Sequence, residues 1–276
     1  EAHRLGIGVI LDVIYNHFGP SGNYTGAYSP YYISRRHGTE WGDSVNYDGK
    51  QAGPVREFVA ANTAYWIAEY HLDGFRYDAT QAVFDDSPEH VLTLASRAAR
   101  QAAGDKPIVL YAENDAQDVR HVESPERGGF GMDGLWNDDF HHACRVAATG
   151  HAEFYYADYT GSPQELLSAI RWGYLYQGQW VPRLQRTRGT PSRHLKAARF
   201  VHYLQNHDQV ANSARGLRIH QLTTPGRFRA LTTLLLLGPQ TPMLFMGQEF
   251  AASSPWLFFA DHDVDLGRLV RQGRWE

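Results

Sequence analysis

The sequence of 276 residues predicts an α/β fold built on a mainly parallel sheet. Three observations support this class. Short apolar strand-like runs alternate with helical stretches, the first run is apolar almost without interruption, and polar residues gather where successive runs end. Active sites lie at such strand ends both in (β/α)8 barrels and in doubly wound sheets. No G-x-G-x-x-G loop follows a strand, which disfavours a dinucleotide-binding doubly wound sheet.

The first strand is expected over residues 8–16, a β-branched and apolar run typical of a strand buried on both faces. Residues 18–53 are rich in Gly, Tyr, Asn and Ser, which predicts a long β-to-α loop or a small subdomain. Pro54 then starts a helix that reaches about His71. The second strand is expected within the stretch 73–81. The elements expected after it are, in chain order, a helix over 88–103, strands over 108–112 and 134–136, a helix closed by Gly150, a helix from Ser162 to Gly173, a strand over 200–205, a helix over 225–237 and a strand over 243–246. These six strands are two short of an eight-stranded barrel.

The composition excludes several partners. The 26 basic and 30 acidic residues give a net charge of −4 without a basic cluster, which argues against nucleic acid and against an anionic membrane surface. No segment approaches the ~20 apolar residues of a membrane span. Aromatic residues make up 13% of the chain and suit stacking on an uncharged ligand such as a sugar. The single cysteine, Cys144, is expected to be a buried small hydrophobe and fits a reducing cytoplasm.

Three strand ends carry an acid with a polar neighbour: Asp78 near Arg76, Glu113 before Asn114, and Asp208 after His207. Two converging carboxyl groups, one ionised and one protonated, are the minimum for cleavage of a glycosidic bond. Arg76 and Asp78 leave a strand on the same face, so their pairing selects Asp78 as the ionised nucleophile. By itself, this pair could equally be a structural ion pair.

The apolar run before Glu113 predicts desolvation, which favours the protonated form that a general acid needs. Asp208 is then free to hold sugar hydroxyls or to stabilise a cationic transition state. A metal site that combines these acids with His17, His71 and His207 is the alternative chemistry. No H-x-H, H-E-x-x-H or cysteine spacing supports it, so we predict neither a metal nor a cofactor.

Four stretches in this order resemble the conserved regions of the α-amylase family of glycoside hydrolases: 12–17, 74–78, Glu113 and 206–208. The resemblance implies a partial (β/α)8 barrel carrying about strands 3 to 8, with the N-terminal strands and the flanking β domains outside this chain, which also does not begin with Met. It implies a retaining mechanism with Asp78 as nucleophile, Glu113 as acid/base and Asp208 as transition-state stabiliser. The residues that it implies for substrate binding are Asp12, Asn16, His17, Arg76, Asn206 and His207.

Finer motifs resemble the branch of this family that hydrolyses the α-1,4 bond next to the terminal trehalose unit of malto-oligosyltrehalose. They are the stretches 15–24, 136–142, 176–179, 204–209, 244–249 and 258–262. The chain departs from that branch at Tyr77, Gln81, Gln248 and Phe250. Two alternatives remain open: a branching enzyme, which transfers the glycosyl group to a sugar hydroxyl, and a non-catalytic carbohydrate-binding relative, which the presence of all three acids disfavours.

Overall fold

The computed structural model describes residues 1–213, 215–258 and 261–275. The chain forms two compact units. The first comprises Glu1–Trp136 and Tyr176–Phe200, and the second comprises Asn137–Leu175 and Val201–Glu276. Phe259 and Ala260, which belong to the motif over 258–262, lie outside the described residues. Among the described helices, none has the length and apolar character that crossing a membrane requires.

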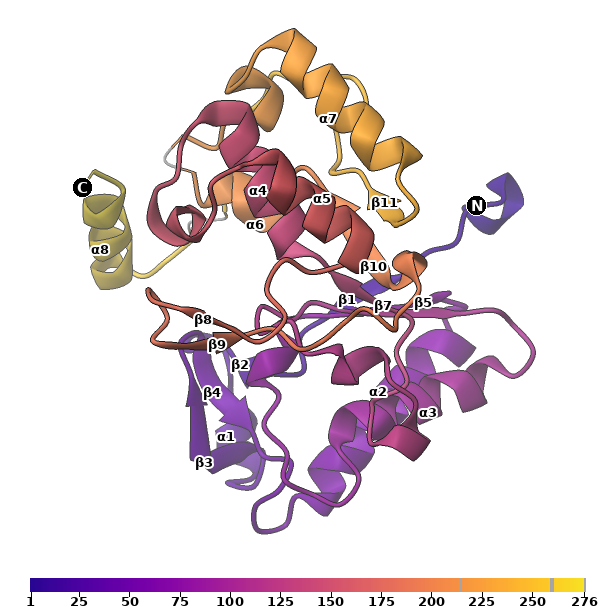
Figure 1. Ribbon diagram of the computed structural model, residues 1–276. Helices are drawn as coiled ribbons and strands as arrows, with labels where there is room; N and C mark the ends of the chain where they lie inside the picture. The colour runs from indigo at the N-terminus through magenta and orange to yellow at the C-terminus, as the bar shows by residue number, and fades with distance from the viewer. Residues whose placement is uncertain (214, 259–260, 276) are drawn as a thin grey trace. The chain divides into compact units, whose positions relative to one another are not determined.

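Four parallel strands form the sheet of the first unit (Figure 1). In sheet order they are β1 (Leu11–Val13), β5 (Gly74–Tyr77), β6 (Val109–Ala112) and β7 (Gly134–Trp136). Phe75, Leu110 and Leu135 are fully buried and form part of the core. Because the strands are parallel, their C-terminal ends lie along one edge of the sheet.

Two long helices of the first unit, α2 (Gly53–Ala68) and α3 (Val91–Ala103), lie side by side (Figure 1). The buried positions of α2 recur every four residues at Val55, Val59, Thr63 and Ile67, as expected for one face of a helix. The helix ends at Ala68, three residues before the expected end, and His71 has a left-handed backbone (φ 56°) that no helix can include.

The excursion over 18–53 forms a small antiparallel sheet with a short helix. Its elements are β2 (His17–Phe18), α1 (Thr25–Tyr28), β3 (Ile33–Thr39) and β4 (Gly42–Val45). A second antiparallel pair joins β8 (Gln179–Val181) and β9 (Arg186–Arg188). The 3-10 helices of this unit are η1 (His3–Leu5), η2 (Thr80–Ala82), η3 (Val119–Val122), η4 (Pro125–Arg127) and η6 (Ala197–Arg199).

In the second unit, β10 (Phe200–Tyr203, whose first residue belongs to the first unit) pairs in parallel with β11 (Thr241–Met243). The helical elements are α4 (Asp138–Thr149), η5 (Phe154–Asp158), α5 (Pro163–Trp172), α6 (His207–Ala211), η7 (Ile219–Gln221), α7 (Pro225–Leu237) and α8 (Val264–Trp275). Side-chain caps begin α5 and α7, since the Ser162 hydroxyl accepts from the N–H of Glu165 and the Thr224 hydroxyl accepts from the N–H of Arg227.

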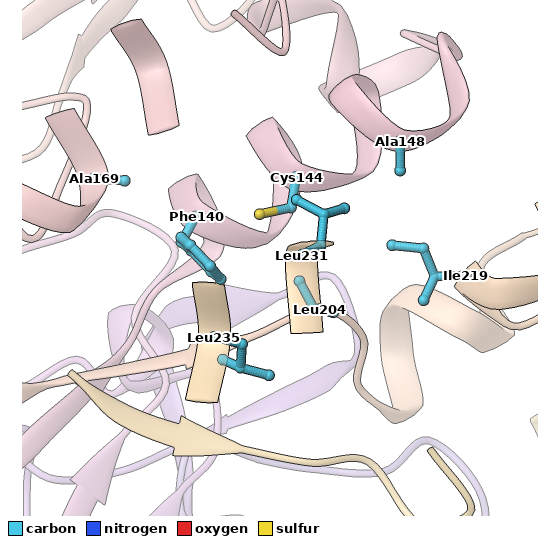
Figure 2. Close-up of a cluster of buried hydrophobic side chains, with 8 residues drawn as sticks. All are labelled: Phe140, Cys144, Ala148, Ala169, Leu204, Ile219, Leu231 and Leu235. Atoms are coloured by element: carbon cyan, nitrogen blue, oxygen red, sulfur yellow. The ribbon is translucent and has the colours of Figure 1, made fainter. Parts of the chain in front are cut away.

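The core of the second unit is a cluster of buried apolar side chains on three helices and the segments between them (Figure 2). The cluster comprises Phe140, Cys144, Ala148, Ala169, Leu204, Ile219, Leu231 and Leu235. Cys144 is fully buried, as predicted, and burial raises the pKa of its thiol. A thiol that stays protonated is a packing group and a poor nucleophile.

The predicted α/β class with parallel strands is confirmed. The prediction of the last strand over 243–246 is wrong, because β11 covers Thr241–Met243. The reason is the partner strand. β10 ends at Tyr203, which lies opposite Met243, so β10 offers no paired residue for the apolar residues after Met243.

Candidate active site

Arg76, on β5, lies at the centre of a group of carboxylates. Its Nη1 donates hydrogen bonds to Asp12 Oδ1 (2.7 Å) and Asp78 Oδ1 (2.8 Å), and its Nη2 donates to Glu113 Oε2. The arginine itself is 3% exposed. Sequence reasoning paired Arg76 with Asp78, and the structure adds two further carboxylates to the same guanidinium.

The electrostatics of Arg76 favour a permanent positive charge. Burial alone acts against the charged guanidinium, but the carboxylates of Glu113, Asp12 and Asp78 outweigh it and raise the pKa of Arg76 above its ordinary value. One cation therefore faces three acids, and small changes in its position alter the environment of all three.

Asp78 is held at both carboxylate oxygens. Oδ1 accepts from Arg76, Oδ2 accepts from Asn16 Nδ2 (3.0 Å), and the same Nδ2 also donates to the backbone oxygen of Asp78 (2.7 Å). Asn16 is 1% exposed, and its Oδ1 contacts Nδ1 of His17. The stretch over 12–17 is thus brought against the proposed nucleophile, and the carboxylate of Asp78 has a fixed orientation.

Glu113 is held by the turn that follows β5. The Oε2 atom of Glu113 accepts a hydrogen bond from the N–H of Ala79 (3.1 Å). Ala79 itself has a left-handed backbone conformation (φ 37°). The backbone carbonyl oxygen of Glu113 accepts from the N–H (2.9 Å) and the Oγ1 (2.6 Å) of Thr80. A left-handed alanine costs about 1 kcal/mol, which the tertiary contacts around it offset.

The surroundings of Glu113 differ from the apolar environment that its preceding run predicts. The residues before Glu113 are apolar, but its side chain leaves the end of β6 towards Arg76 and is 19% exposed. A guanidinium in hydrogen-bond contact favours an ionised carboxylate. In the free protein, a cation contacts the Glu113 carboxyl group, which the apolar run before it did not indicate.

Trp136, the last residue of β7, covers the guanidinium of Arg76. The Cζ atom of Arg76 lies 4.3 Å from the centre of the indole ring, and Trp136 is 9% exposed. The sequence predicts Trp136 at the end of the strand over 134–136 and at the start of the motif over 136–142, but it does not indicate the contact with Arg76. That contact follows from the place of Trp136 at the end of a parallel strand, level with the acids.

Gln81, one of the departures from the family branch, contacts the segment after Glu113. Its Oε1 accepts from the N–H of Asp115 (3.4 Å), and Oδ1 of Asp115 accepts from Nη2 of Arg188 (3.1 Å) on β9. The residue at position 81 is therefore linked to the segment that carries one of the acids.

The remaining predicted residues lie together in the second unit, at the start of α6. Asn206 is 2% exposed and caps this helix, because its Oδ1 accepts from the N–H of Gln209 (2.8 Å). His207 and Asp208 follow, each with about a third of its side chain exposed, and Nε2 of His207 lies 3.6 Å from Oδ2 of Asp208.

A cavity of about 720 Å³ adjoins this helix within the second unit. Gln209 lines it together with Tyr155 and Tyr156, whose hydroxyls donate to Gln209 Oε1 (2.6 and 2.9 Å). Gln209 belongs to the motif over 204–209, whereas the sequence did not identify Tyr155 and Tyr156, because no local pattern brings residues 155–156 next to residue 209.

In the described part of the chain, one group of side chains has the geometry to hold a metal ion. The ligand atoms of His37, Asp48 and Asp86 lie within 4.8 Å of one another. Arg36 already donates hydrogen bonds to Asp48 (3.0 Å) and Asp86 (3.1 Å). The guanidinium therefore compensates the charge of these two carboxylates without a metal ion. The histidines considered in the metal alternative, His17, His71 and His207, form no such group among the described residues.

No protein-family model matches the chain. It is 43% identical, over 99% of its length, to the malto-oligosyltrehalose trehalohydrolase of Deinococcus radiodurans, of which it covers 44%. A crystal structure of a putative alpha amylase from Salmonella typhimurium has a TM-score of 0.90 and 39% identity, with 99% of this chain and 47% of that chain covered.

A 1,4-alpha-glucan branching enzyme of Bacillus mycoides is 31% identical over 50% of the chain and 23% of the relative. The chain spans about half the length of the trehalohydrolases that it matches. The resemblance found in the motifs is thereby confirmed along nearly the whole chain, which is a homologue of part of the malto-oligosyltrehalose trehalohydrolases and of a putative alpha amylase.

Proposed function

We propose that the full-length protein hydrolyses the α-1,4-glucosidic bond next to the terminal trehalose unit of malto-oligosyltrehalose and releases trehalose. The observation that carries the proposal is the shared guanidinium of Arg76, which holds the carboxylates of Asp78 and Glu113 next to each other. A retaining glycosidase needs two carboxyl groups at roughly 5–5.5 Å. The names of the relatives supply the substrate.

In the first chemical step, a carboxylate oxygen of Asp78 attacks the anomeric carbon on the side opposite to the leaving group. The bond from that carbon to the trehalose oxygen breaks, and Glu113 gives its proton to this oxygen. In the second step, Glu113 takes a proton from water, the water oxygen attacks the same carbon, and the bond to Asp78 breaks. The product keeps its anomeric configuration, and both acids return to their starting states.

The contacts of the free protein suit Asp78 for its role, since Arg76 and Asn16 orient both of its oxygens. The role of Glu113 adds a requirement. Its contact with Arg76 must weaken when substrate enters, so that Glu113 holds a proton in the first step. In this proposal Asp208 stabilises the positive charge that develops on the sugar.

The remaining polar residues bind the sugar hydroxyls. They are Asp12, Asn16, His17 and Arg76 in the first unit and Asn206 and His207 in the second. We assign the six parallel strands to about strands 3 to 8 of a (β/α)8 barrel. The small sheet of β2, β3 and β4 is then an insertion between a barrel strand and the helix that follows it.

The remaining strands and flanking β domains then come from parts of the protein outside this chain. A cytoplasmic location, favoured by the single cysteine, belongs to the same proposal.

A branching enzyme is the second candidate, because a relative with that name matches half of the chain. It uses the same three acids, and the difference lies in the second step, where a sugar hydroxyl takes the place of water. The acids alone do not distinguish the two activities, and only the products do.

Product analysis of the full-length protein on malto-oligosyltrehalose and on amylose tests the proposal. We expect trehalose from the first substrate and neither α-1,6 branches nor maltose from the second. Asp78→Asn and Glu113→Gln should each reduce the rate at least about 1,000-fold. Asp105→Asn, at an exposed acid after α3, is the matched control and should leave the rate unchanged. Branches made from amylose would replace the proposal with the transferase.

A further inference from the structure

The buried face of the Arg76 guanidinium rests on the indole of Trp136, at 4.3 Å from Cζ to the ring centre. We propose that Trp136 is a positioning residue, which fixes the plane of the Arg76 guanidinium so that it reaches Asp78 and Glu113 together. This inference rests on the proposed function, because it assigns Trp136 to the same two acids.

The sheet register explains why Trp136 reaches Arg76. Arg76 lies opposite Tyr111 on β6, and Tyr111 lies opposite Gly134 on β7. Side chains two positions further along each strand leave on the same face. Two positions after Arg76, Tyr111 and Gly134 come Asp78, Glu113 and Trp136. These three residues therefore lie side by side across neighbouring strands, on the same face as Arg76 and next to it.

The hydrogen bonds of Arg76 leave one orientation unfixed. Both Nη atoms donate to carboxylates, whereas Nε is buried and has no hydrogen-bond partner among the described residues. The Nη contacts lie near the plane of the guanidinium, and the ring contact is made by its face. The carboxylates alone only weakly prevent the guanidinium from tilting out of its plane. The indole, which lies against the face of the guanidinium, prevents this tilt.

The contact also has an electrostatic part. The face of an indole is negative and attracts a cation, most strongly where both are removed from water. Arg76 is 3% and Trp136 9% exposed, so water screens this attraction little. Without the ring, the guanidinium is free to tilt towards Asp12, whose side chain is half-exposed, and away from the two acids.

Substitution of Trp136 in the full-length protein tests the role. Trp136→Phe keeps an aromatic face and should retain activity within about threefold, whereas Trp136→Met keeps apolar bulk and should lower kcat about tenfold. KM should change little, because the indole acts through Arg76. The matched control is Trp66→Met on α2, where a tryptophan packs on Tyr70 away from the acids.

The split between kcat and KM separates positioning from sugar stacking. A lower kcat with an unchanged KM in Trp136→Met, and no change in either constant in Trp66→Met, supports the positioning role. A raised KM with an unchanged kcat would instead make Trp136 a sugar-stacking residue and overturn the inference. Equal losses in Trp136→Phe and Trp136→Met would also overturn it.

Fluorinated tryptophans at position 136 provide a second test, which applies even if Trp136→Met does not fold. Each added fluorine weakens the negative ring face and barely changes its shape. We expect kcat for hydrolysis of α-maltosyl fluoride to fall stepwise along the series, and a flat series contradicts the inference. This substrate reports the nucleophilic step whichever glucan product is formed, so failure of the trehalose assignment and failure of the Trp136 role are distinguishable.

Discussion

Arg76 and Glu113 are joined by a hydrogen bond, although they come from the neighbouring strands β5 and β6 and lie 37 positions apart. The same guanidinium also binds Asp78. In the free protein the proposed nucleophile and the proposed acid/base therefore share one cation. A change at Arg76 acts on both acids, and a change at either acid alters the charge that Arg76 faces.

Arg76→Lys should lower kcat/KM by about 100-fold or more in the full-length protein. A lysine ammonium is a single point charge and cannot hold several carboxylates in the plane of a guanidinium. Arg35→Lys, at an exposed position on β3, is the control and should be close to neutral. Steady-state kinetics on malto-oligosyltrehalose check this prediction, and retention of a tenth of the activity by Arg76→Lys would contradict the shared-cation geometry.

Glu113→Ala should be rescued by azide when the substrate is an activated α-glucosyl fluoride. Fluoride leaves without a proton donor, so Asp78 still forms the covalent intermediate, and azide then attacks without the help of a base. We expect faster turnover and a glycosyl azide of retained α configuration, identified by NMR. A β azide from this variant would mean that Glu113 is the nucleophile and that the two roles are exchanged.

Gly74→Ala should destabilise the protein by at least about 3 kcal/mol. Gly74 begins β5 with φ 145°, and a Cβ there would lie 1.7 Å from the backbone oxygen of Val109 on β6. Gly53→Ala is the matched control and should be close to neutral, since nothing lies within 4 Å of its added Cβ. The denaturant midpoint should fall strongly in Gly74→Ala and change little in Gly53→Ala.

Stability should fall as the pH is lowered from 6.5 towards 3. Burial lowers the pKa of His202 to about 3, and burial together with Arg145 lowers that of His141 to about 3. Between the unfolded value of 6.5 and these folded values, the unfolded chain binds protons that the folded chain does not, so stability is full above pH 6.5 and is lost below it.

His202→Gln tests this dependence because it removes one of the two titrations and keeps a polar group next to Asn137. Between pH 4 and 6, the slope of the unfolding free energy against pH should be smaller by up to about 1.4 kcal/mol per pH unit. The control variant is His262→Gln, in which the replaced histidine is exposed. An unchanged slope in His202→Gln would mean that His202 is protonated in the folded protein.

Local patterns predicted the starts of two helices and the class of the fold. Ser162 and Thr224 start helices because a hydroxyl followed by proline satisfies free N–H groups within one turn, and no distant residue is needed. The last strand was misplaced for the opposite reason. A run such as 243–246 is apolar enough for a strand, but β10 decides which residues have partners.

By itself, the sequence determined the parallel α/β class, the positions of the acids at strand ends, and the resemblance to the trehalohydrolases, because apolar periodicity, strand alternation and short motifs are local properties of the chain. Only the tertiary structure decided that Arg76 also holds Glu113, that a left-handed Ala79 donates to the same carboxylate, and that Trp136 covers the guanidinium. These contacts join residues from three strands. Their geometry depends on strand register and on the direction of each side chain, which are set by pairing and packing across the sheet and not by any one segment.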